Sequence, residues 1–304
     1  MRKLCEAITL SSLQDDPYHD DKMAKAQIVQ SLFFSPTGTT RKILSAIKEH
    51  IGLPSATDID LTLPPQRDVF TGNVEGDIIL VGSPVYHGSP PWPMIDPLNR
   101  IKGGGRWAIP VAVYGNRSAE TCVEEMVKIL RAKGFKILAS ASFVAEHSWA
   151  SESHPYALGR PDERDLKIAT EFGEQIRDKL SSGPSEIQTS GLLRDWFSKE
   201  MVESFPAGYH RRAVETAKGL GWVVFSEAAE CTKCMSCVSS CPTGALSIDP
   251  QMVDDGLCIR CMACTRVCPE GVLSLHYDDS PSSLERFERL GKIFAVRKEP
   301  KIYI

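Results

Sequence analysis

The sequence lacks any run of about 20 apolar residues, the length that a helix needs to span a bilayer. Residues 1–30 also lack the continuous apolar stretch of a secretory signal peptide, because they turn polar and acidic after a basic start. The formal net charge of −4 provides no basic excess of the kind that nucleic-acid binders carry. We therefore expect a cytoplasmic protein with no membrane span, no signal peptide and no nucleic-acid partner.

The composition is that of a packed globular protein. Hydrophobic residues account for 42% and charged residues for 24% of the 304 positions. A chain of this length is more often two domains than one. We interpret residues 1–26 as a partly ordered tail that precedes the first domain.

The ten cysteines are distributed unevenly along the chain. Cys5 and Cys122 are isolated, and we interpret them as a tail thiol and a helix-packing residue. The other eight fall between Cys231 and Cys268. Because no signal peptide accompanies them, reduced thiols that bind metal are a better interpretation than a disulfide framework.

The eight clustered cysteines form two runs of identical spacing, Cys-x2-Cys-x2-Cys-x3-Cys-Pro. The runs are Cys231, Cys234, Cys237 and Cys241, followed by Pro242, and Cys258, Cys261, Cys264 and Cys268, followed by Pro269. The surrounding residues repeat as well, since CTKCMSCVSSCPTGALSI aligns without a gap with CIRCMACTRVCPEGVLSL. This self-similarity predicts two copies of one small unit, related by an approximate twofold axis.

The spacing suits a four-iron cluster. Cysteines three apart in a loop can present three thiolates to three irons, and in the bacterial two-cluster pattern the fourth cysteine of each run ligates the other cluster. The predicted ligand sets are Cys231, Cys234, Cys237 and Cys268 for one 4Fe–4S cluster, and Cys258, Cys261, Cys264 and Cys241 for the second. A pair of zinc sites is the alternative, although zinc motifs usually separate their Cys-x2-Cys pairs by about a dozen residues or more. Residues 222–277 resemble a short bacterial-type ferredoxin with two such clusters.

The N-terminal half opens with a strand-like run over residues 28–34, followed by Ser35-Pro-Thr-Gly-Thr-Thr40 and an amphipathic helix that ends at Gly52. A strand, a hydroxyl-rich turn and a helix N-terminus make an anion site. The loop lacks the Gly-Lys of a P-loop, so a nucleoside triphosphate is not implied, whereas the phosphate of flavin mononucleotide (FMN) would fit. An ordinary turn with capping hydroxyls is the alternative.

Strand and helix patterns then alternate as a doubly wound α/β fold requires. We expect further strands over residues 77–82, 107–113 and 136–145, and a closing helix over 162–180. The first two of these strands end in loops rich in small and aromatic residues, at 83–88 and 114–117. Such loops meet at the carboxyl edge of a parallel sheet, where ligands bind.

Residues 27–182 resemble the flavodoxin family, whose phosphate loop Ser/Thr-x-Thr-Gly-x-Thr is matched at every position by residues 35–40. The resemblance implies a five-stranded parallel sheet of order 2-1-3-4-5 with FMN at its edge. The flavin-binding residues that it implies are Ser35, Thr37, Gly38, Thr39, Thr40, Ser83, Pro84, Val85, Tyr86, His87, Gly88, Tyr114, Gly115, Asn116 and Arg117.

Several features of this half stay open. Arg117 departs from the acidic or neutral residues that are commoner in the third loop of the family. The candidates for an aromatic ring that stacks on the flavin are Tyr86, Tyr114, Trp92 and Trp149. The segment 146–149 either lies close to the flavin or is a plain surface loop.

The whole chain resembles flavodoxin–ferredoxin fusions of anaerobes. The predicted domains are a flavodoxin-like domain over 27–182, a linker over 183–221, a two-cluster α+β ferredoxin domain over 222–277 and a tail over 278–304. We expect the linker to pack partly on one domain, with some periodicity around residues 192–197. The tail has helix-like apolar spacing, and we expect it to cover part of the ferredoxin domain.

These features predict an iron–sulfur flavoprotein that passes electrons between FMN and two 4Fe–4S clusters and couples one-electron with two-electron redox partners. Redox proteins would be its donor and acceptor. The alternative is an FMN-dependent reductase of a small molecule or metal centre; a redox sensor would need a reading element that is not found. The sequence contains no G-x-G-x-x-G fingerprint, so direct use of NAD(P)H is not indicated. Lys233 and Arg260 occupy equivalent positions in the two runs and could tune the clusters, as Arg117 could tune the flavin.

Overall fold

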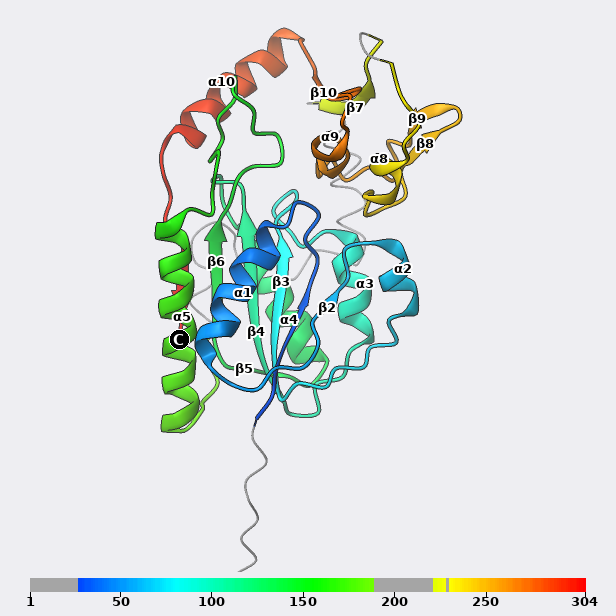
Figure 1. Cartoon of the computed structure of the whole chain (residues 1–304). Coiled ribbons are helices and arrows are strands. Elements are labelled where there is room, and N and C mark those ends of the chain that lie inside the picture. The colour runs from blue at the N-terminus through cyan, green and yellow to red at the C-terminus, as the bar shows by residue number, and fades with distance from the viewer. Residues whose placement is uncertain (1–26, 189–220, 228–229) are drawn as a thin grey trace, which may run out of the picture.

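The N-terminal half forms a sheet with helices on both faces, as the computed structural model in Figure 1 shows. The structure describes residues 27–188, 221–227 and 230–304. The predicted N-terminal tail, Cys5 and the periodic part of the linker lie outside the described residues. The start of the linker is described, and Ile187 is buried against this half, where its amide N donates to the carbonyl of Ile137.

The elements of this half, which we name the flavodoxin-like unit, alternate along the chain. They are β1 (Val29–Phe33), α1 (Thr39–Ile51), β2 (Ile59–Asp60), α2 (Pro64–Val69), β3 (Ile78–Pro84), α3 (Trp92–Arg100), β4 (Trp107–Tyr114), α4 (Cys122–Ala132), β5 (Lys136–Ile137), β6 (Ser140–Val144) and α5 (Glu163–Ser182). Parallel pairing runs through β2, β1, β3, β4 and β6 in that order, and the short β5 pairs with β4. Since β5 and β6 divide the fifth predicted strand between them, the predicted order 2-1-3-4-5 is confirmed.

The sheet is buried on both faces, which explains why its central strands are almost continuously apolar. On one face α1 and α5 pack together, and Ile47 and Phe172 belong to the same buried cluster as the sheet residues beneath them. On the other face α3 and α4 contribute Met94 and Met126 to a second cluster. Helix α1 ends where predicted, at Gly52, whose φ of 70° is left-handed.

The second half of the chain begins with a small cysteine-rich unit, which Figure 1 shows above the carboxyl edge of the sheet. Its elements are β7 (Gly221–Phe225), α8 (Ser236–Ser239), β8 (Leu246–Ile248), β9 (Gln251–Val253), α9 (Ala263–Val267) and β10 (Leu273–Tyr277). Strands β7 and β10 pair antiparallel, as do β8 and β9.

The two copies of the sequence repeat have the same backbone conformation at equivalent positions. Lys233 and Arg260 have φ values of 56° and 55°, and Met235 and Met262 have 64° and 59°. Each methionine precedes a short helix, α8 in the first copy and α9 in the second. The two cysteine runs therefore form loops of the same shape.

The C-terminal tail contacts part of the cysteine-rich unit, as expected, but it also packs on the flavodoxin-like unit, which was not expected. It forms α10 (Pro281–Ala295), which crosses above the flavodoxin-like unit (Figure 1). It ends in β11 (Lys301–Tyr303), which pairs antiparallel with β6 at the edge of the sheet. Arg297 pairs with Asp162, the residue that caps α5, at 2.7 Å. The tail thus adds a seventh strand to the sheet, and Phe287, in the middle of α10, meets the ring of Tyr277 in the cysteine-rich unit.

Within the described ranges, none of the helices combines the length and apolar character that crossing a bilayer requires.

Candidate functional site

A cavity of about 210 Å³ lies where the carboxyl ends of the parallel strands meet the cysteine-rich unit and α10. Its walls include ten residues that the sequence predicted for flavin binding. These are Thr37, Thr39, Pro84, Val85, Tyr86, His87, Gly88, Tyr114, Gly115 and Arg117. The three predicted loops therefore converge on one site, as the edge of a doubly wound sheet should bring them together.

The other five predicted residues lie outside the cavity wall. The Ser35 hydroxyl accepts a hydrogen bond from the amide of Arg41, and Gly38 forms the left-handed turn before α1 with φ 81°. Thr40 is buried, as is Ser83, whose hydroxyl donates to the carbonyl of Pro84. Asn116, the fifth, binds the C-terminal tail.

The N-terminus of α1 is open to an anion. Its first turn contains no acidic residue, and its N-cap residue, Gly38, has no side chain to cap it. The Ser35 hydroxyl accepts from the amide of Arg41, the third residue of the helix. Thr37 and Thr39 line the cavity beside it, with their hydroxyls 3.5 Å apart. Backbone N–H groups at a helix N-terminus and two hydroxyl donors suit a phosphate group.

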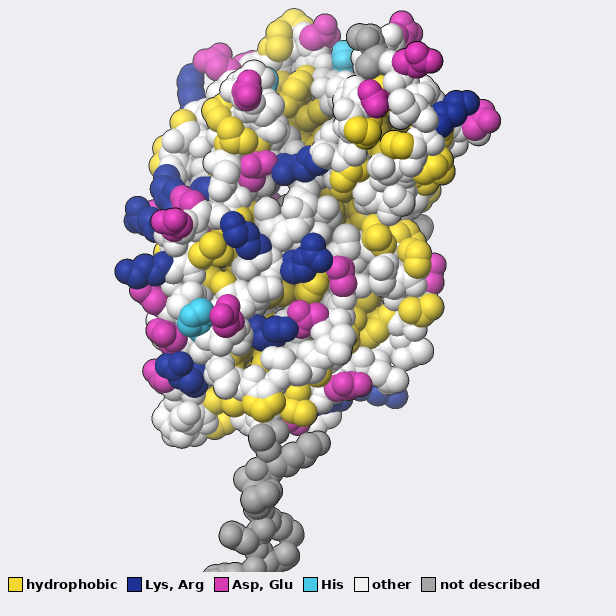
Figure 2. Space-filling model, viewed as in Figure 1, with side chains coloured by type: hydrophobic (Ala, Val, Ile, Leu, Met, Phe, Trp, Pro, Cys, Tyr) yellow, Lys and Arg dark blue, Asp and Glu magenta, His cyan; other side chains and the backbone are white. Residues whose placement is uncertain are grey.

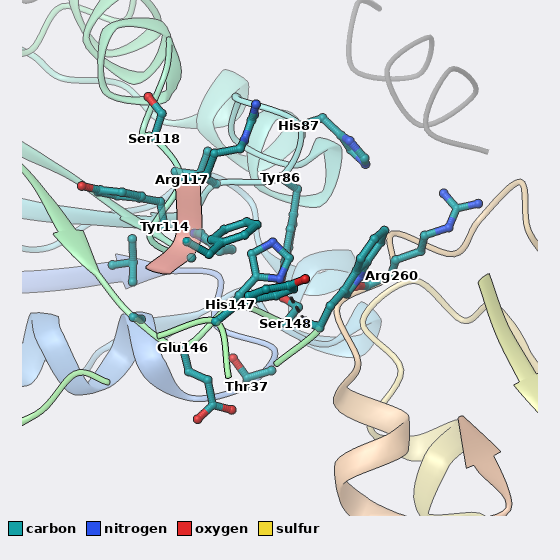
Figure 3. Close-up of a pocket in the computed structure, with 18 of the residues that line it drawn as sticks. Thr37, Tyr86, His87, Tyr114, Arg117, Ser118, Glu146, His147, Ser148 and Arg260 are labelled. Carbon is teal, nitrogen blue, oxygen red and sulfur yellow. Dashed lines mark hydrogen bonds between the residues drawn. The ribbon is translucent and has the colours of Figure 1, made fainter. Parts of the chain in front are cut away.

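Aromatic side chains form the wall next to this anion site. Figure 3 shows Tyr86 and His147 side by side, whereas the hydroxyl of Tyr114 points away from them. The hydroxyl of Tyr86 bonds to the side chain of Ser148, and Trp149 also lines the cavity. Trp92, another candidate for stacking, does not line it.

His147 is held in a defined tautomer at the centre of this wall. Its Nδ1 accepts a hydrogen bond from the amide of Trp149 at 3.1 Å, so the proton of the neutral ring lies on Nε2. Burial, assisted by the positive charge of Arg117, lowers the pKa of His147 from 6.5 to about 4. The imidazole is therefore neutral at pH 7, and the cavity gains a hydrogen-bond donor without a charge.

The C-terminal tail closes the cavity from the far side. Phe287, Leu290 and Phe294 of α10 line it, and Phe294 stacks on Tyr156 with ring centroids 4.4 Å apart. The Asn116 side-chain amide donates to the carbonyls of Phe294 and Val296, each at 2.9 Å. Asn116 thus acts on the site indirectly, because it fixes the helix that covers the cavity.

Four cysteines lie together in the buried part of the cysteine-rich unit. This inner cysteine set consists of Cys241, Cys258, Cys261 and Cys264, all of them buried. Burial raises the pKa of Cys261, and the three other thiols of the set raise it further. Cys241, which comes from the first run, therefore neighbours the first three cysteines of the second run, as the predicted exchange of ligands requires.

The remaining four cysteines form an outer cysteine set, namely Cys231, Cys234, Cys237 and Cys268. Burial and the neighbouring thiols of Cys268 and Cys231 raise the pKa of Cys237. In contrast to the inner set, Cys234 is exposed and both Cys231 and Cys268 are partly exposed. The outer set therefore lies at the surface of the cysteine-rich unit.

The arrangement of the thiols does not suit a single metal ion. Among the residues that the structure describes, no three His, Cys, Asp or Glu side chains are close enough to hold one ion. A tetrahedral zinc site would need such closeness, because its Zn–S bonds are about 2.3 Å long.

A buried cation beside the inner set, Arg260, also favours a negatively charged cluster at this position. Arg260 is 3% exposed, and its Nε and Nη1 atoms have no hydrogen-bond partner in the described part of the chain. Its nearest carboxylate, that of Asp255, lies 4.0 Å from Nη2. Its charge counteracts the effect of burial on the Cys258 pKa, so the two side chains are close. A cluster held by four thiolates would supply the negative charge that this guanidinium lacks.

The cysteine-rich unit and the flavodoxin-like unit meet at the cavity. Tyr86, on the loop after β3, belongs to the same apolar cluster as Cys261 and Ile259. Burial raises the pKa of Tyr86, and the Cys261 thiol raises it further, which shows that the two side chains are close. The inner set therefore borders the loop that was predicted to contact the flavin.

Polar contacts surround this apolar junction. Arg266 pairs with Glu146 at 2.7 Å, and the Trp149 indole N–H donates to the carbonyl of Arg260. On the other side, the buried Arg67 donates to the carbonyls of Leu61 and Thr62 and to that of Pro242, directly after Cys241.

The comparisons with known proteins agree with the cysteine pattern. Residues 230–272 match the family model described as a 4Fe-4S dicluster domain. The cysteine-rich unit is a 4Fe–4S dicluster domain. The comparison with curated proteins gave no match.

Solved structures resemble the flavodoxin-like unit. A flavodoxin from the domain Archaea is 16% identical with a TM-score of 0.38, and the match covers 51% of this chain and 99% of that one. Flavodoxin 2 from Bacillus cereus is 16% identical with a TM-score of 0.38, and the match covers 51% of this chain and 99% of that one. Rubredoxin oxygen:oxidoreductase from the anaerobe Desulfovibrio gigas is 14% identical with a TM-score of 0.39, and the match covers 51% of this chain and 36% of that one. The assignment of a flavodoxin-like fold rests on the strand order described above.

Several cavity residues were not among those that the sequence predicted. The segment 146–149 was considered, and all four of its residues line the cavity. Tyr156, Ile259, Arg260 and the three apolar residues of α10 were not considered for the flavin site. The only signal for α10 was its apolar spacing, which shows that one face is covered but does not show by what.

Proposed function

We propose that the chain is an electron-transfer iron–sulfur flavoprotein, which passes electrons between FMN in the cavity and two 4Fe–4S clusters held by the inner and outer cysteine sets. A flavin exchanges one or two electrons and a 4Fe–4S cluster exchanges one, so the combination would couple one-electron to two-electron redox partners. The contact between Tyr86 and Cys261 carries the proposal, because it joins the predicted flavin loop to the inner set.

The cavity residues fit FMN in three respects. The N-terminus of α1, with Thr37 and Thr39 beside it, would hold the phosphate. Tyr86 and Trp149 would provide aromatic contact for a flat ring system. His147 would offer its Nε2–H as a neutral donor, and Arg117 would add positive charge, which favours an anionic reduced ring.

The protein would provide position and insulation for these cofactors. All four thiols of the inner set are buried, so water is kept from the region between them and the cavity. Arg260 and Arg67 would add buried positive charge near the inner set, which favours a reduced cluster. Arg67 would also keep the loop at Cys241 against the flavodoxin-like unit.

Anaerobic purification with iron, sulfide and flavin analysis tests the proposal. We expect about eight irons, eight sulfides and one FMN per chain. Cys261→Ser should lose about half of the iron, because the inner set then lacks a ligand. Cys122→Ser is the matched control, since Cys122 is buried in α4 of the flavodoxin-like unit, and it should keep the full content. Zinc in place of iron, or iron without flavin, would contradict the proposal.

The lining of the cavity supports a second candidate, an FMN-dependent reductase fed by its own clusters. The cavity extends beyond the predicted flavin loops as far as Arg260 and α10, and His147 faces it. Steady-state turnover with a reduced ferredoxin and small organic acceptors, metal chelates or dioxygen distinguishes the two. A reductase should turn over one acceptor selectively and lose that activity in His147→Gln, whereas an electron carrier should reduce acceptors without such selectivity.

A further inference from the structure

The two cysteine runs have the same sequence pattern and the same loop shape, yet their surroundings are opposite. In the second copy, Met262 is 3% exposed. In the first copy, the equivalent Met235 is 48% exposed. The cations that precede them by two residues differ in the same way, because Arg260 is buried and Lys233 is exposed. The face that one copy buries is therefore presented to the outside by the other.

The flavodoxin-like unit covers the loop of the second copy. Its loop packs against Tyr86 through Cys261 and Ile259, and its backbone carbonyl at Arg260 accepts a hydrogen bond from the Trp149 indole. The occupant of this face is thus an aromatic edge of the unit that is proposed to hold FMN. An approximately twofold module with one face occupied by a redox-active unit has an equivalent face for a second one.

The first copy provides that face in an accessible form. Thr232, Lys233, Cys234 and Met235 are all exposed, and the thiol of Cys234 reaches the surface. Figure 2 shows hydrophobic side chains on the surface of the cysteine-rich unit at the upper right. The face combines one large exposed apolar side chain, that of Met235, with an exposed thiol of the outer set, and it matches in sequence the face that the second copy buries.

We propose that residues 232–235 form the docking face for a small one-electron carrier protein, and that electrons enter or leave the chain through the outer cysteine set. This inference rests on the proposed function, because it assumes clusters in both sets. The partner should present an apolar, aromatic-bearing edge next to its own redox centre, as the flavodoxin-like unit presents Tyr86 and Trp149 to the second copy.

In the reducing direction, each encounter moves one electron. The carrier is oxidised by one electron, and the chain is reduced by one electron at the outer set. Two encounters supply the two electrons that full reduction of the flavin takes up, with its protons drawn from solvent. Small contact areas are typical of such short-lived redox encounters.

The test compares two charge substitutions at methionines of similar exposure, 48% for Met235 and 53% for Met252. Met235→Glu places a carboxylate in the proposed face, and Met252→Glu places one on β9, where Met252 is 53% exposed. Each protein is mixed anaerobically with a reduced two-cluster bacterial ferredoxin. Full spectra are recorded over time, so that the bleaching of the flavin is separated from the overlapping absorbance of the iron–sulfur clusters. Reduced methyl viologen serves as a small reductant that needs no docking face.

With the ferredoxin, Met235→Glu should lower the second-order rate constant about tenfold, while Met252→Glu should leave it unchanged. With methyl viologen, both variants should match the unmodified chain. The docking face is refuted when Met235→Glu reacts with the ferredoxin as fast as the unmodified chain, when Met252→Glu is slowed as much, or when both reductants are slowed alike. A chain without iron or flavin would instead refute the proposed function, and iron and flavin analysis of each protein shows which has failed.

Discussion

Acidification should destabilise the folded chain through His147. The ring is in edge contact with Trp149, Tyr156 and Phe294, with centroid distances of 5.9, 5.9 and 5.0 Å. Its Nδ1 accepts the amide hydrogen bond of Trp149. Protonation would break this bond and place a charge among aromatic rings close to Arg117, which is why the pKa is lowered to about 4.

The direction and the size of the effect follow from the two pKa values. The unfolded chain takes up this proton near pH 6.5 and the folded chain only near pH 4, so between these values the unfolded state binds more protons. The contribution is complete above about pH 6.5 and is lost as the pH falls toward 4. At about 1.36 kcal/mol per pKa unit, the difference corresponds to at most about 3 kcal/mol. This is an upper value, because the ring borders the cavity and water there would reduce the cost of charging it.

Nuclear magnetic resonance of histidine-labelled protein measures the pKa directly. His147→Gln identifies the resonance, and glutamine keeps an acceptor for the Trp149 amide. His154→Gln is the control, since His154 lies on a neighbouring loop and does not line the cavity. The variant lacking His147 should lose less stability between pH 6.5 and 4 than the unmodified chain. A His147 resonance that titrates near 6.5, as in an unstructured peptide, would refute this reasoning.

Three further substitutions test the site. Arg260→Gln should lower the reduction potential of one cluster, whereas Lys233→Gln should have a much smaller effect because solvent and salt screen an exposed charge. Protein-film voltammetry compares the two potentials, and equal shifts would contradict the role of burial. Arg67→Met should slow electron transfer between the clusters and the flavin without loss of iron, since it removes the hydrogen bond to Pro242 beside the inner set. Flash photolysis measures the rate of electron transfer, and an unchanged rate would exclude a role of Arg67 in holding the two units together. Phe294→Ala should cost about 3 kcal/mol of unfolding free energy and weaken flavin binding, because it opens the cavity; denaturation and flavin titration measure both, and unchanged flavin affinity would show that α10 is not part of the site.

The sequence was sufficient for the parts of the fold that local pattern determines. Ile43, Ile47 and Ile51 recur at helical spacing, and all three are buried in α1. The buried strands read as apolar runs, and the rule that parallel strands end at one edge brought the predicted loops together. The spacing of the cysteines predicted which thiols would become neighbours, because it reflects the shape of the loop that carries them.

The tail could not be predicted, because amphipathic spacing does not identify the partner of a helix. Leu284 and Ile293 share the spacing of Phe287 and Leu290, yet they are 56% and 39% exposed. Phe294, one residue outside the pattern, is the one that is buried against Tyr156. Strand β11 is only three residues long, and its pairing with β6 depends on a sheet edge that lies far away in the sequence.

The difference between the two cysteine sets was also beyond the sequence. Two copies of one motif carry the same local information, so neither copy indicates that it is the buried one. Their asymmetry arises only when the second copy meets Tyr86 and Trp149 across the junction of the two units. Lys233 and Arg260 illustrate this, since they are chemically alike and equivalent in position but differ in burial.

Transfer of an electron within one chain tests the central claim most directly. The anaerobic protein is reduced with a flash-generated one-electron donor, and the absorbances of the clusters and of the flavin are followed over a range of protein concentrations. A cluster signal that decays as the flavin is reduced, at a rate independent of concentration, is the result that we predict from the contact between Tyr86 and Cys261. A flavin that stays oxidised, or whose reduction accelerates in proportion to the protein concentration, would contradict the account.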